Sequence, residues 1–332
     1  MSQRTIRVGM LSRWHVHADE YARAVNDSPD ARVHAVWDED PERGMRWAAE
    51  LGVDFMADYR RLLDAIDAVV VTAPTDRHAE LIIVAAAAGK HVFTEKVLAP
   101  RLADARRIAA AVRAAPIQFA ISFPRRTIAP LLYAKAQVES GALGSVTLLR
   151  IRIAHDGALR NWLPEHFYDP VACGGGAMID LGAHGMYLAR WLLGTPRRVT
   201  SLFTSVSGRA VEDNAVSMIE FDGGAVAINE TSFVSWGGAY SVEIDATRGG
   251  LLMASPRDVR VRRGEGKHWQ SVDALPAAAP MPIPRWLHGI AHDDASDFGM
   301  GIDAACELSE MMEAAYLSQR ERRTVDFAEL EH

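Results

Sequence analysis

The N-terminal part of the chain alternates short apolar runs with longer segments in which apolar residues recur at helical spacing. The run at Ala68–Thr72 is continuous rather than alternating, which is typical of a parallel strand buried on both faces. Strands are predicted at Ile6–Leu11, Arg32–Trp37, Ala68–Thr72, His91–Thr94 and Ile117–Ile121, and helices at His17–Asn26, Pro41–Leu51, Arg77–Ala88 and Leu102–Ala114. Repeated strand–helix–strand units predict the α/β class, with a doubly wound parallel sheet that binds its ligand beyond the carboxyl ends of its strands.

After Phe123 the pattern changes to separate helices and a series of strand-like runs divided by turns. Helices are predicted at Leu131–Ser140, Ala177–Leu193 and Gly301–Gln319, strands at Val146–Ile153 and within Arg198–Arg263, an edge strand at Thr324–Phe327, an irregular stretch at His155–Gly176 and a surface loop at Pro276–Pro284. This order predicts an α+β domain with a mostly antiparallel, open sheet. We therefore expect two domains, residues 1–122 and residues 123–332.

Composition narrows the class of protein. The chain has 332 residues, 49% of them hydrophobic and 24% charged, which is the balance of a globular protein. Its formal net charge of −7 argues against nucleic acid as a partner, because proteins that bind a duplex usually present a basic face. We expect neither a secretory leader nor a membrane span. Cys173 and Cys306 belong to no metal or redox motif, which predicts reduced thiols in a cytoplasmic protein.

The turn after the first strand is where a sheet of this kind holds the pyrophosphate of a dinucleotide. The usual G-x-G-x-x-G pattern is absent, because Ser12–His17 reads Ser-Arg-Trp-His-Val-His. Gly9 does not replace it, since it lies inside the strand. The Ser12 hydroxyl can donate a hydrogen bond, and Trp14 or His15 can flank the phosphate or the ribose. On this turn alone, a dinucleotide site remains one of two open interpretations.

Asp38 strengthens the case for a dinucleotide. It ends the second predicted strand, about 20 residues after the turn, where a carboxylate accepts hydrogen bonds from the adenosine ribose hydroxyls. A carboxylate there repels a 2′-phosphate, so NAD is favoured over NADP, although Arg43 lies nearby and can weaken that discrimination. The alternative is a turn acid or a cap for the helix that begins at Pro41.

An acid–base pair, Glu95-Lys96, follows a buried strand and therefore lies at the edge of the sheet where the ligand is expected. The segments around it, Thr72–His78 (TAPTDRH) and Ala88–Lys96 (AGKHVFTEK), resemble the glucose–fructose oxidoreductase / inositol dehydrogenase / MocA (GFO/IDH/MocA) family. Further along, Gly174–His184 (GGGAMIDLGAH) is similar to that family's G-G-G-x-x-x-D-x-G-x-H segment. The matches follow the family's order over most of the chain.

The chain departs from the family pattern at three places. The glycine-rich turn is replaced, Val97 stands where the family usually has Pro, and Tyr187 stands where many members have Asp. The first departure concerns how the pyrophosphate is held, and the second concerns the backbone after Lys96.

The resemblance implies a Rossmann domain at residues 1–122 that binds NAD, and a domain at residues 123–332 that binds substrate. Because antiparallel sheets with a free face often associate, we expect a homodimer or homotetramer through the sheet of the second domain. It implies hydride transfer between the nicotinamide and a hydroxyl or carbonyl carbon of a sugar, polyol, cyclitol or sugar acid. The cofactor-binding residues predicted on this basis are Ser12, Arg13, Trp14, His15, Asp38, Ala73, Pro74, His78, Glu95 and Lys96.

Asp180 and His184 are four residues apart on a predicted helix, so they are expected to share one face. A histidine suits removal of a hydroxyl proton near neutral pH, and a fixed positive charge stabilises the resulting alkoxide. We therefore predict that Lys96, Asp180 and His184 are catalytic and meet at one substrate oxygen, the lysine coming from the first domain. The alternative for the Asp/His pair is a hydrogen bond on the surface of a helix.

The substrate pocket is less clearly marked. Arg125, His155, Trp162 and His184 are candidates, because a tryptophan among polar side chains suits a polyhydroxylated ring; neighbouring candidates are Arg152, Asp156, Arg160 and Asn161. His288, His292, Asp293 and Asp294 do not follow a known ligand spacing, so no metal is predicted.

Three functions fit these observations. The favoured one is a dehydrogenase or reductase acting on CH–OH groups. The second is an NAD-recycling lyase or glycosidase-type enzyme that oxidises a sugar carbon transiently, and the third is a non-catalytic NAD-binding sensor. Accumulation of free NADH separates the first from the second, while the presence of Lys96, Asp180 and His184 argues against the third.

Overall fold

The computed structural model describes residues 5–255, 257–264, 266, 268–294, 296 and 299–331. Contacts divide the chain into two compact units, Met1–Ser122 with Pro280–Cys306 and Phe123–Ala279 with Glu307–His332. One break falls after Ser122, where the sequence places the domain boundary, but Pro280–Cys306 belongs to the first unit and not, as expected, to the second.

The first unit is built on a parallel sheet. Its six described strands have the order β3-β2-β1-β4-β5-β6, and every pair of neighbours is parallel. They are β1 (Ile6–Leu11), β2 (Ala31–Trp37), β3 (Asp54–Phe55), β4 (Ala68–Val71), β5 (His91–Thr94) and β6 (Phe119–Ile121). The chain order reverses between β1 and β4, which is where a doubly wound sheet binds its ligand.

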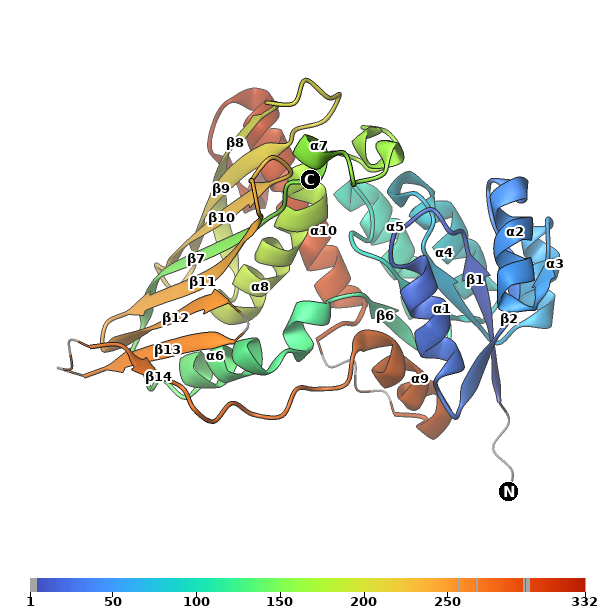
Figure 1. Cartoon of the computed structure of the whole chain (residues 1–332), viewed down its shortest axis with the longest axis horizontal. Helices are drawn as coiled ribbons and strands as arrows, with labels where there is room; N and C mark the ends of the chain where they lie inside the picture. Colours follow the sequence, from blue (N-terminus) through green and yellow to red (C-terminus); the bar gives the residue numbers. More distant parts are fainter. Residues whose placement is uncertain are drawn as a thin grey trace. The chain divides into compact units, whose positions relative to one another are not determined.

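Helices pack on both faces of this sheet (Figure 1). They are α1 (Ala18–Asn26), α2 (Pro41–Leu51), α3 (Tyr59–Ala65), the short 3₁₀ turn η1 (Thr75–Arg77), α4 (His78–Ala87), α5 (Leu102–Arg113) and α9 (Pro282–His292). Val8 and Met10 of β1 share a core cluster with residues of α1, α2 and α9. A Cβ on Gly9, which points to the other face, would lie 2.7 Å from Ile66 and 2.8 Å from Leu62. Gly9 is therefore the place where β1 and the α3 segment approach each other closely.

The segment around α9 differs from the sequence prediction. A surface loop was predicted at Pro276–Pro284, and this prediction was wrong for the last residues, because α9 begins at Pro282. Ile283, Trp286 and Leu287 are buried at helical spacing in the core of the first unit. Proline is favoured in the first turn of a helix, so the proline-rich stretch concealed a helix start. The sequence patterns also missed α3 and β3.

The second unit contains a nine-stranded sheet among its described residues, with the order β14-β13-β12-β11-β7-β10-β9-β8-β15. Its strands are β7 (Val146–Ala154), β8 (Pro196–Thr204), β9 (Asn214–Phe221), β10 (Val226–Ser232), β11 (Ala239–Ala246), β12 (Gly249–Ser255), β13 (Asp258–Arg263), β14 (Gln270–Ser271) and β15 (Val325–Asp326). Neighbours are antiparallel except β7 and β10. The predicted fold class, a doubly wound parallel sheet plus an α+β domain with a mostly antiparallel sheet, is confirmed.

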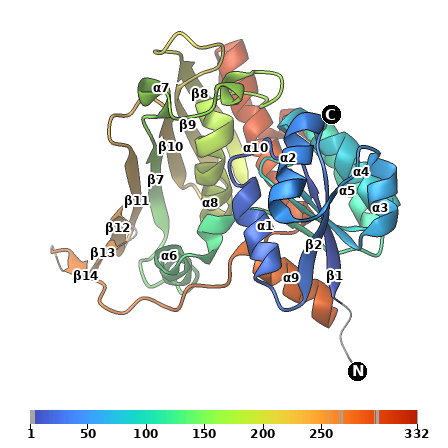
Figure 2. The same cartoon turned by 45° about the vertical axis from the view of Figure 1, so that its right-hand side comes forward.

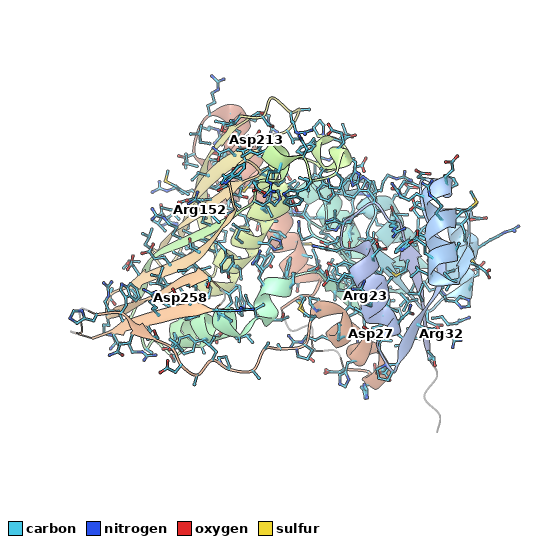
Figure 3. The ribbon with its side chains drawn as sticks, viewed as in Figure 1. Arg23, Asp27, Arg32, Arg152, Asp213 and Asp258 are labelled. Carbon is cyan, nitrogen blue, oxygen red and sulfur yellow. The ribbon has the colours of Figure 1, made fainter. Side chains whose placement is uncertain are left out.

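Helices lie on one face of this second sheet (Figures 1 and 2). They are α6 (Ala129–Glu139), α8 (Ala183–Leu193) and α10 (Ile302–Glu321), with α7 (Gly157–Arg160) and the short turns η2 (Pro124–Thr127), η3 (Glu165–Tyr168), η4 (Met178–Gly182) and η5 (Phe327–Glu331) nearby. In β7, Ile151 and Ile153 are buried while Arg150 and Arg152 are exposed. The side that carries these arginines, here called the open face, has no helix over it in the described part of the unit (Figure 3, where Arg152 is labelled).

The helix predicted at Ala177–Leu193 has two parts, the π-helical η4 and the regular helix α8. π-Helical turns are rare and often occur at functional sites, so this irregularity draws attention to Asp180, which lies within it. Across the described residues, no helix combines the length and apolar character needed to cross a membrane.

Candidate active site

The turn between β1 and α1 follows a tight course without glycine. Ser12 has a φ of 76°, in the left-handed region that favours glycine. Its Oγ accepts a hydrogen bond from the Trp14 backbone N–H at 3.1 Å and donates one to Glu39 Oε1 at 3.0 Å. The His15 N–H donates to the Thr72 carbonyl at 3.1 Å. Ser12 therefore adopts a glycine-like backbone conformation, and its own hydroxyl stabilises the turn.

Asp38 is buried beside this turn, and its carboxylate is fully engaged. Oδ1 accepts hydrogen bonds from the Asp40 N–H at 2.9 Å and Arg43 Nη2 at 2.6 Å. Oδ2 accepts from the Arg13 N–H at 2.9 Å and Arg43 Nε at 3.0 Å. A carboxylate offers about four acceptor sites, so protein donors occupy all of them. The cap of α2 is Asp40, which excludes the alternative that Asp38 caps this helix.

Glu95 lies at the end of β5 in the middle of a buried polar cluster. Its Oε1 is 3.0 Å from His17 Nδ1 and 3.8 Å from His15 Nδ1. The Tyr21 hydroxyl donates to the same oxygen and lies 2.7 Å from Ser122 Oγ. Burial opposes the negative charge, but the charges of His15 and His17 outweigh it and hold the pKa of Glu95 well below its usual value.

Contacts with Glu95 and His78 hold the loop that carries Lys96 in place. The Lys96 N–H donates to Glu95 Oε2 at 2.8 Å, and the Lys96–Val97 peptide bond is cis. His78 Nδ1 lies 3.0 Å from the Val97 carbonyl, and its Nε2 lies 3.1 Å from the Ala73 carbonyl. His78 is 1% exposed and links the loops after β4 and β5. It can therefore influence a cofactor only by positioning these two loops.

In the second unit, Glu212 holds the start of η4. Its Oε1 accepts hydrogen bonds from the Gly176 N–H at 2.9 Å, the Met178 N–H at 3.0 Å and the Tyr316 hydroxyl at 2.6 Å. A Cβ on Gly176 would lie 2.0 Å from the Glu212 carbonyl oxygen, and one on Gly175 would lie 2.0 Å from the Tyr316 hydroxyl. The absence of side chains at Gly175 and Gly176 therefore allows Glu212 and Tyr316 to lie against the backbone at the start of η4.

His184 is buried on α8 and held by Tyr187. Its Nδ1 lies 3.0 Å from the Tyr187 hydroxyl, which also accepts a hydrogen bond from the Arg125 N–H at 3.2 Å. The Tyr187 ring stacks on Phe123 with 4.3 Å between centroids. Tyr187, which stands where many family members have Asp, therefore contacts the imidazole, and the structure brings the His184 ring and the Arg125 backbone to the same hydroxyl.

His155 forms a second group with Trp162 and Phe233. Its ring stacks on Phe233 at 4.8 Å and lies 4.6 Å from the Trp162 ring. Burial lowers the pKa of His155, and the negative charge of Asp180 opposes this without reversing it. Asp180 lies in the π-helical η4 and His184 in the regular helix α8, and the predicted pairing of the two side chains stays a prediction.

The remaining candidates have local partners. Asp156 accepts a hydrogen bond from Trp162 Nε1 at 2.9 Å, and Asn161 Oδ1 accepts one from Arg209 Nη2 at 2.8 Å. Arg152 points to the open face, where it lies 3.8 Å from Glu230. It is therefore on the opposite side of the sheet from the buried residues of β7, and we remove it from the substrate-binding candidates.

Sequence reasoning missed four residues that organise these sites, namely His17, Tyr21, Glu212 and Tyr316. His17 and Tyr21 have a weak sequence signal, since they are four residues apart at the start of a predicted helix and so share one face, and the structure places both against Glu95. Glu212 and Tyr316 have none, because 104 residues separate them.

Comparison with known families follows the division of the chain. Residues 8–123 match the family description "Oxidoreductase family, NAD-binding Rossmann fold", and residues 131–252 match "GFO/IDH/MocA C-terminal domain". The chain is 32% identical over 306 residues to inositol 2-dehydrogenase 1 of Saccharopolyspora erythraea, with 88% of each chain covered. It is 30% identical over 270 residues to scyllo-inositol 2-dehydrogenase (NAD(+)) of Bacillus subtilis, with 76% of this chain and 74% of the relative covered.

Solved structures share the fold at lower identity. A levoglucosan dehydrogenase in complex with NADH and levoglucosan has a TM-score of 0.84 and 22% identity, covering 98% of this chain and 100% of that one. A putative NADPH-dependent oxidoreductase from Desulfitobacterium hafniense has a TM-score of 0.86 and 20% identity, covering 99% of each chain. The two family matches and the two inositol dehydrogenases confirm the resemblance seen in the sequence, and the chain belongs to the GFO/IDH/MocA family of NAD-binding oxidoreductases.

Proposed function

We propose that this oxidoreductase is an NAD-dependent dehydrogenase that oxidises a CH–OH group of a small polyhydroxylated molecule such as a cyclitol, sugar, polyol or sugar acid. The observation that carries the proposal is His184, a buried imidazole whose Nδ1 is fixed by Tyr187. A histidine oriented in this way is suited to take up a hydroxyl proton near neutral pH. The named relatives that oxidise inositols support this class of substrate.

In the proposed reaction, His184 is the general base and Lys96 supplies the positive charge that stabilises the developing alkoxide. Asp180 positions the substrate or the imidazole, and Arg125, His155 and Trp162 bind the substrate. NAD, when bound, would supply the acceptor for the hydride of the carbinol carbon. In the reverse direction His184 returns the proton.

The cofactor is proposed to lie along the carboxyl edge of the parallel sheet. The turn Ser12–His15 would hold the pyrophosphate, Asp38 the adenosine ribose, and the segments at Ala73–Pro74 and Glu95–Lys96 the nicotinamide half. The turn fits this role because Ser12 already has the backbone conformation of a fingerprint glycine. Asp38 favours NAD, since its negative charge repels a 2′-phosphate.

The test is the pair of variants Lys96→Ala and His184→Ala, assayed with a panel of cyclitols, sugars, polyols and sugar acids. We expect both to bind NAD, measured by calorimetry, while turnover falls at least about 100-fold, the scale of general acid–base catalysis. Lys135→Ala is the matched control, because Lys135 pairs with Glu139 on α6. Near-normal turnover in both variants would overturn the roles of Lys96 and His184.

The same assay separates the alternative functions. A dehydrogenase accumulates one NADH per substrate oxidised, whereas an enzyme that recycles NAD consumes substrate without net NADH. Tight NAD binding with no turnover of any substrate would instead favour a sensor. The dehydrogenases among the relatives favour the first outcome.

We also propose that two copies associate through the open face. Leu202, Val216 and Met218 are exposed there on neighbouring strands, with fractions of 68%, 37% and 50%. Apolar side chains grouped on an uncovered sheet commonly mark a subunit contact. Met218→Lys should give a monomer by light scattering, while Trp236→Ser, which removes an exposed ring from the loop after β10, should leave the mass unchanged. A monomeric parent protein would contradict the proposal.

A further inference from the structure

Three side chains with metal-ligating atoms meet at the edge of the parallel sheet. His15 and His17 come from the turn after β1, and Glu95 comes from the end of β5. One ligand atom from each lies within 4.8 Å of the other two, and no other such group of three is found among the described residues. Two of the chain's departures from its family, the glycine-free turn and Val97, lie at or beside this cluster.

Two of the three donor separations are close to those around a single ion, and all three lie within 4.8 Å. Zinc binds histidine nitrogen and carboxylate oxygen at about 2.0–2.2 Å, so two donors of a tetrahedral site lie about 3.3–3.5 Å apart. Here Glu95 Oε1 is 3.0 Å from His17 Nδ1 and 3.8 Å from His15 Nδ1, values on either side of that separation. His15 Nδ1 accepts a long 3.2 Å hydrogen bond from the His17 N–H, which coordination through that nitrogen would replace.

The surroundings have the features of a built site. Glu95 and His15 are 2% and 7% exposed, whereas His17 is 41% exposed and gives an ion access from solvent. The second oxygen of Glu95 is fixed by the Lys96 N–H at 2.8 Å, and the Tyr21 hydroxyl contacts the first. Such supporting hydrogen bonds orient metal-binding carboxylates.

We propose that His15, His17 and Glu95 bind one divalent transition-metal ion, with Zn²⁺ as the expected occupant. Two imidazoles and a carboxylate form a common zinc-binding set that leaves a fourth position for water or another oxygen. The competing explanation is a hydrogen-bonded ion pair between His17 and Glu95 without any metal. Both explanations satisfy the buried carboxylate, so metal binding itself must be measured.

The experiment uses the full chain, stripped with a chelator and titrated with Co²⁺ in the absence of NAD and substrate. We expect one equivalent to bind, with the visible absorption of tetrahedral Co²⁺ and displacement by Zn²⁺. His17→Gln and Glu95→Gln should each weaken binding at least about 100-fold, because loss of a supporting hydrogen bond alone costs 10–100-fold. His17→Gln keeps a polar side chain opposite Glu95 and removes no capping hydrogen bond from α1.

The matched control is the double variant His288→Ala/His292→Ala. These two exposed histidines stack on α9 with 4.0 Å between ring centroids and represent adventitious binding by surface imidazoles. If the control binds Co²⁺ like the parent and the two cluster variants do not, the proposal stands. If the parent binds no stoichiometric metal, or if the cluster variants bind as the parent does, the proposal is overturned. Because neither NAD nor substrate is present, failure here is distinct from failure of the proposed dehydrogenase activity.

Discussion

The four hydrogen bonds that Asp38 accepts govern how a nucleotide can reach it. Two come from backbone N–H groups and belong to the turn, while the other two come from the single side chain of Arg43. Adenosine has two ribose hydroxyls, so movement of Arg43 would free one acceptor site on each carboxylate oxygen. In the proposed site, Arg43 therefore competes with NAD for Asp38 and stays close enough to attract a 2′-phosphate.

Removing the Arg43 side chain should increase the preference for NAD over NADP. For Arg43→Ala we expect the NAD-to-NADP ratio of kcat/KM to rise by about 10-fold, the scale of one hydrogen bond to a charged group. The measurement is steady-state kinetics with both cofactors. Arg46→Ala serves as the control, since Arg46 is exposed on the same helix. An unchanged ratio would show that Asp38 does not meet the ribose.

Tyr187 is the second residue whose contacts have a measurable consequence. In Tyr187→Phe the ring remains stacked on Phe123, but the hydroxyl that meets His184 Nδ1 and the Arg125 N–H is lost. We expect kcat to fall by about 10-fold, the value of one hydrogen bond, with little change in KM. Tyr133→Phe, which removes a hydroxyl bonded to Arg263 at the surface, is the control. Equal kcat in the two variants would contradict an orienting role for Tyr187.

At the scale of an element, the start of η4 depends on the absence of a side chain. In Gly176→Ala the new Cβ would lie 2.0 Å from the Glu212 carbonyl oxygen, and backbone atoms cannot move aside as side-chain ends do. We expect the free energy of unfolding to fall by about 3 kcal/mol and turnover to be lost with it. Denaturant titration measures the first effect. Gly223→Ala, where no atom lies within 4 Å of the new Cβ, should change neither.

Elements bounded by local signals were predictable from the sequence. The bounds of α2 follow from Asp40 as cap, Pro41 in the first turn and Gly52 at φ 70° after the end, all of which act within a few residues. The bounds of β1 and β5 likewise match the apolar runs. By contrast, the π-helical turn η4 is held by Glu212 and Asn229, whose contacts depend on the tertiary fold.

Some residues of the candidate site can likewise be predicted from local sequence features, and others depend on the tertiary fold. The sequence predicts Asp38, Glu95, Lys96 and His184 as site residues, because motifs and strand ends are local features, and their roles stay predictions. It could not predict that Arg43 fills the acceptor sites of Asp38, or that Asp180 lies in a π-helical turn. These outcomes depend on side-chain geometry that a spacing rule does not contain.

At the scale of the whole molecule, four histidines with shifted pKa values link stability to pH, three of them with one sign and one with the other. Burial lowers the pKa of His78, His91 and His155 below the ordinary value of 6.5. Between that value and their folded pKa, the unfolded chain binds more protons than the folded one. Stability from these groups is therefore fully present above pH 6.5 and is lost as the pH falls. His17, whose pKa Glu95 raises despite burial, has the opposite sign and loses its contribution as the pH rises above 6.5.

His91 is the best place to test this linkage, because it lies outside the proposed site and its Nδ1 accepts a hydrogen bond from the Gln118 N–H at 2.9 Å. A protonated Nδ1 is a donor and cannot accept a hydrogen bond. Protonation of His91 would therefore break its hydrogen bond with the Gln118 N–H. We expect the urea midpoint of the parent to fall between pH 7 and pH 5, and His91→Gln to show a shallower fall, since its amide oxygen can accept the bond without titrating. If the two curves ran parallel, the acid sensitivity would have to come from groups other than His91.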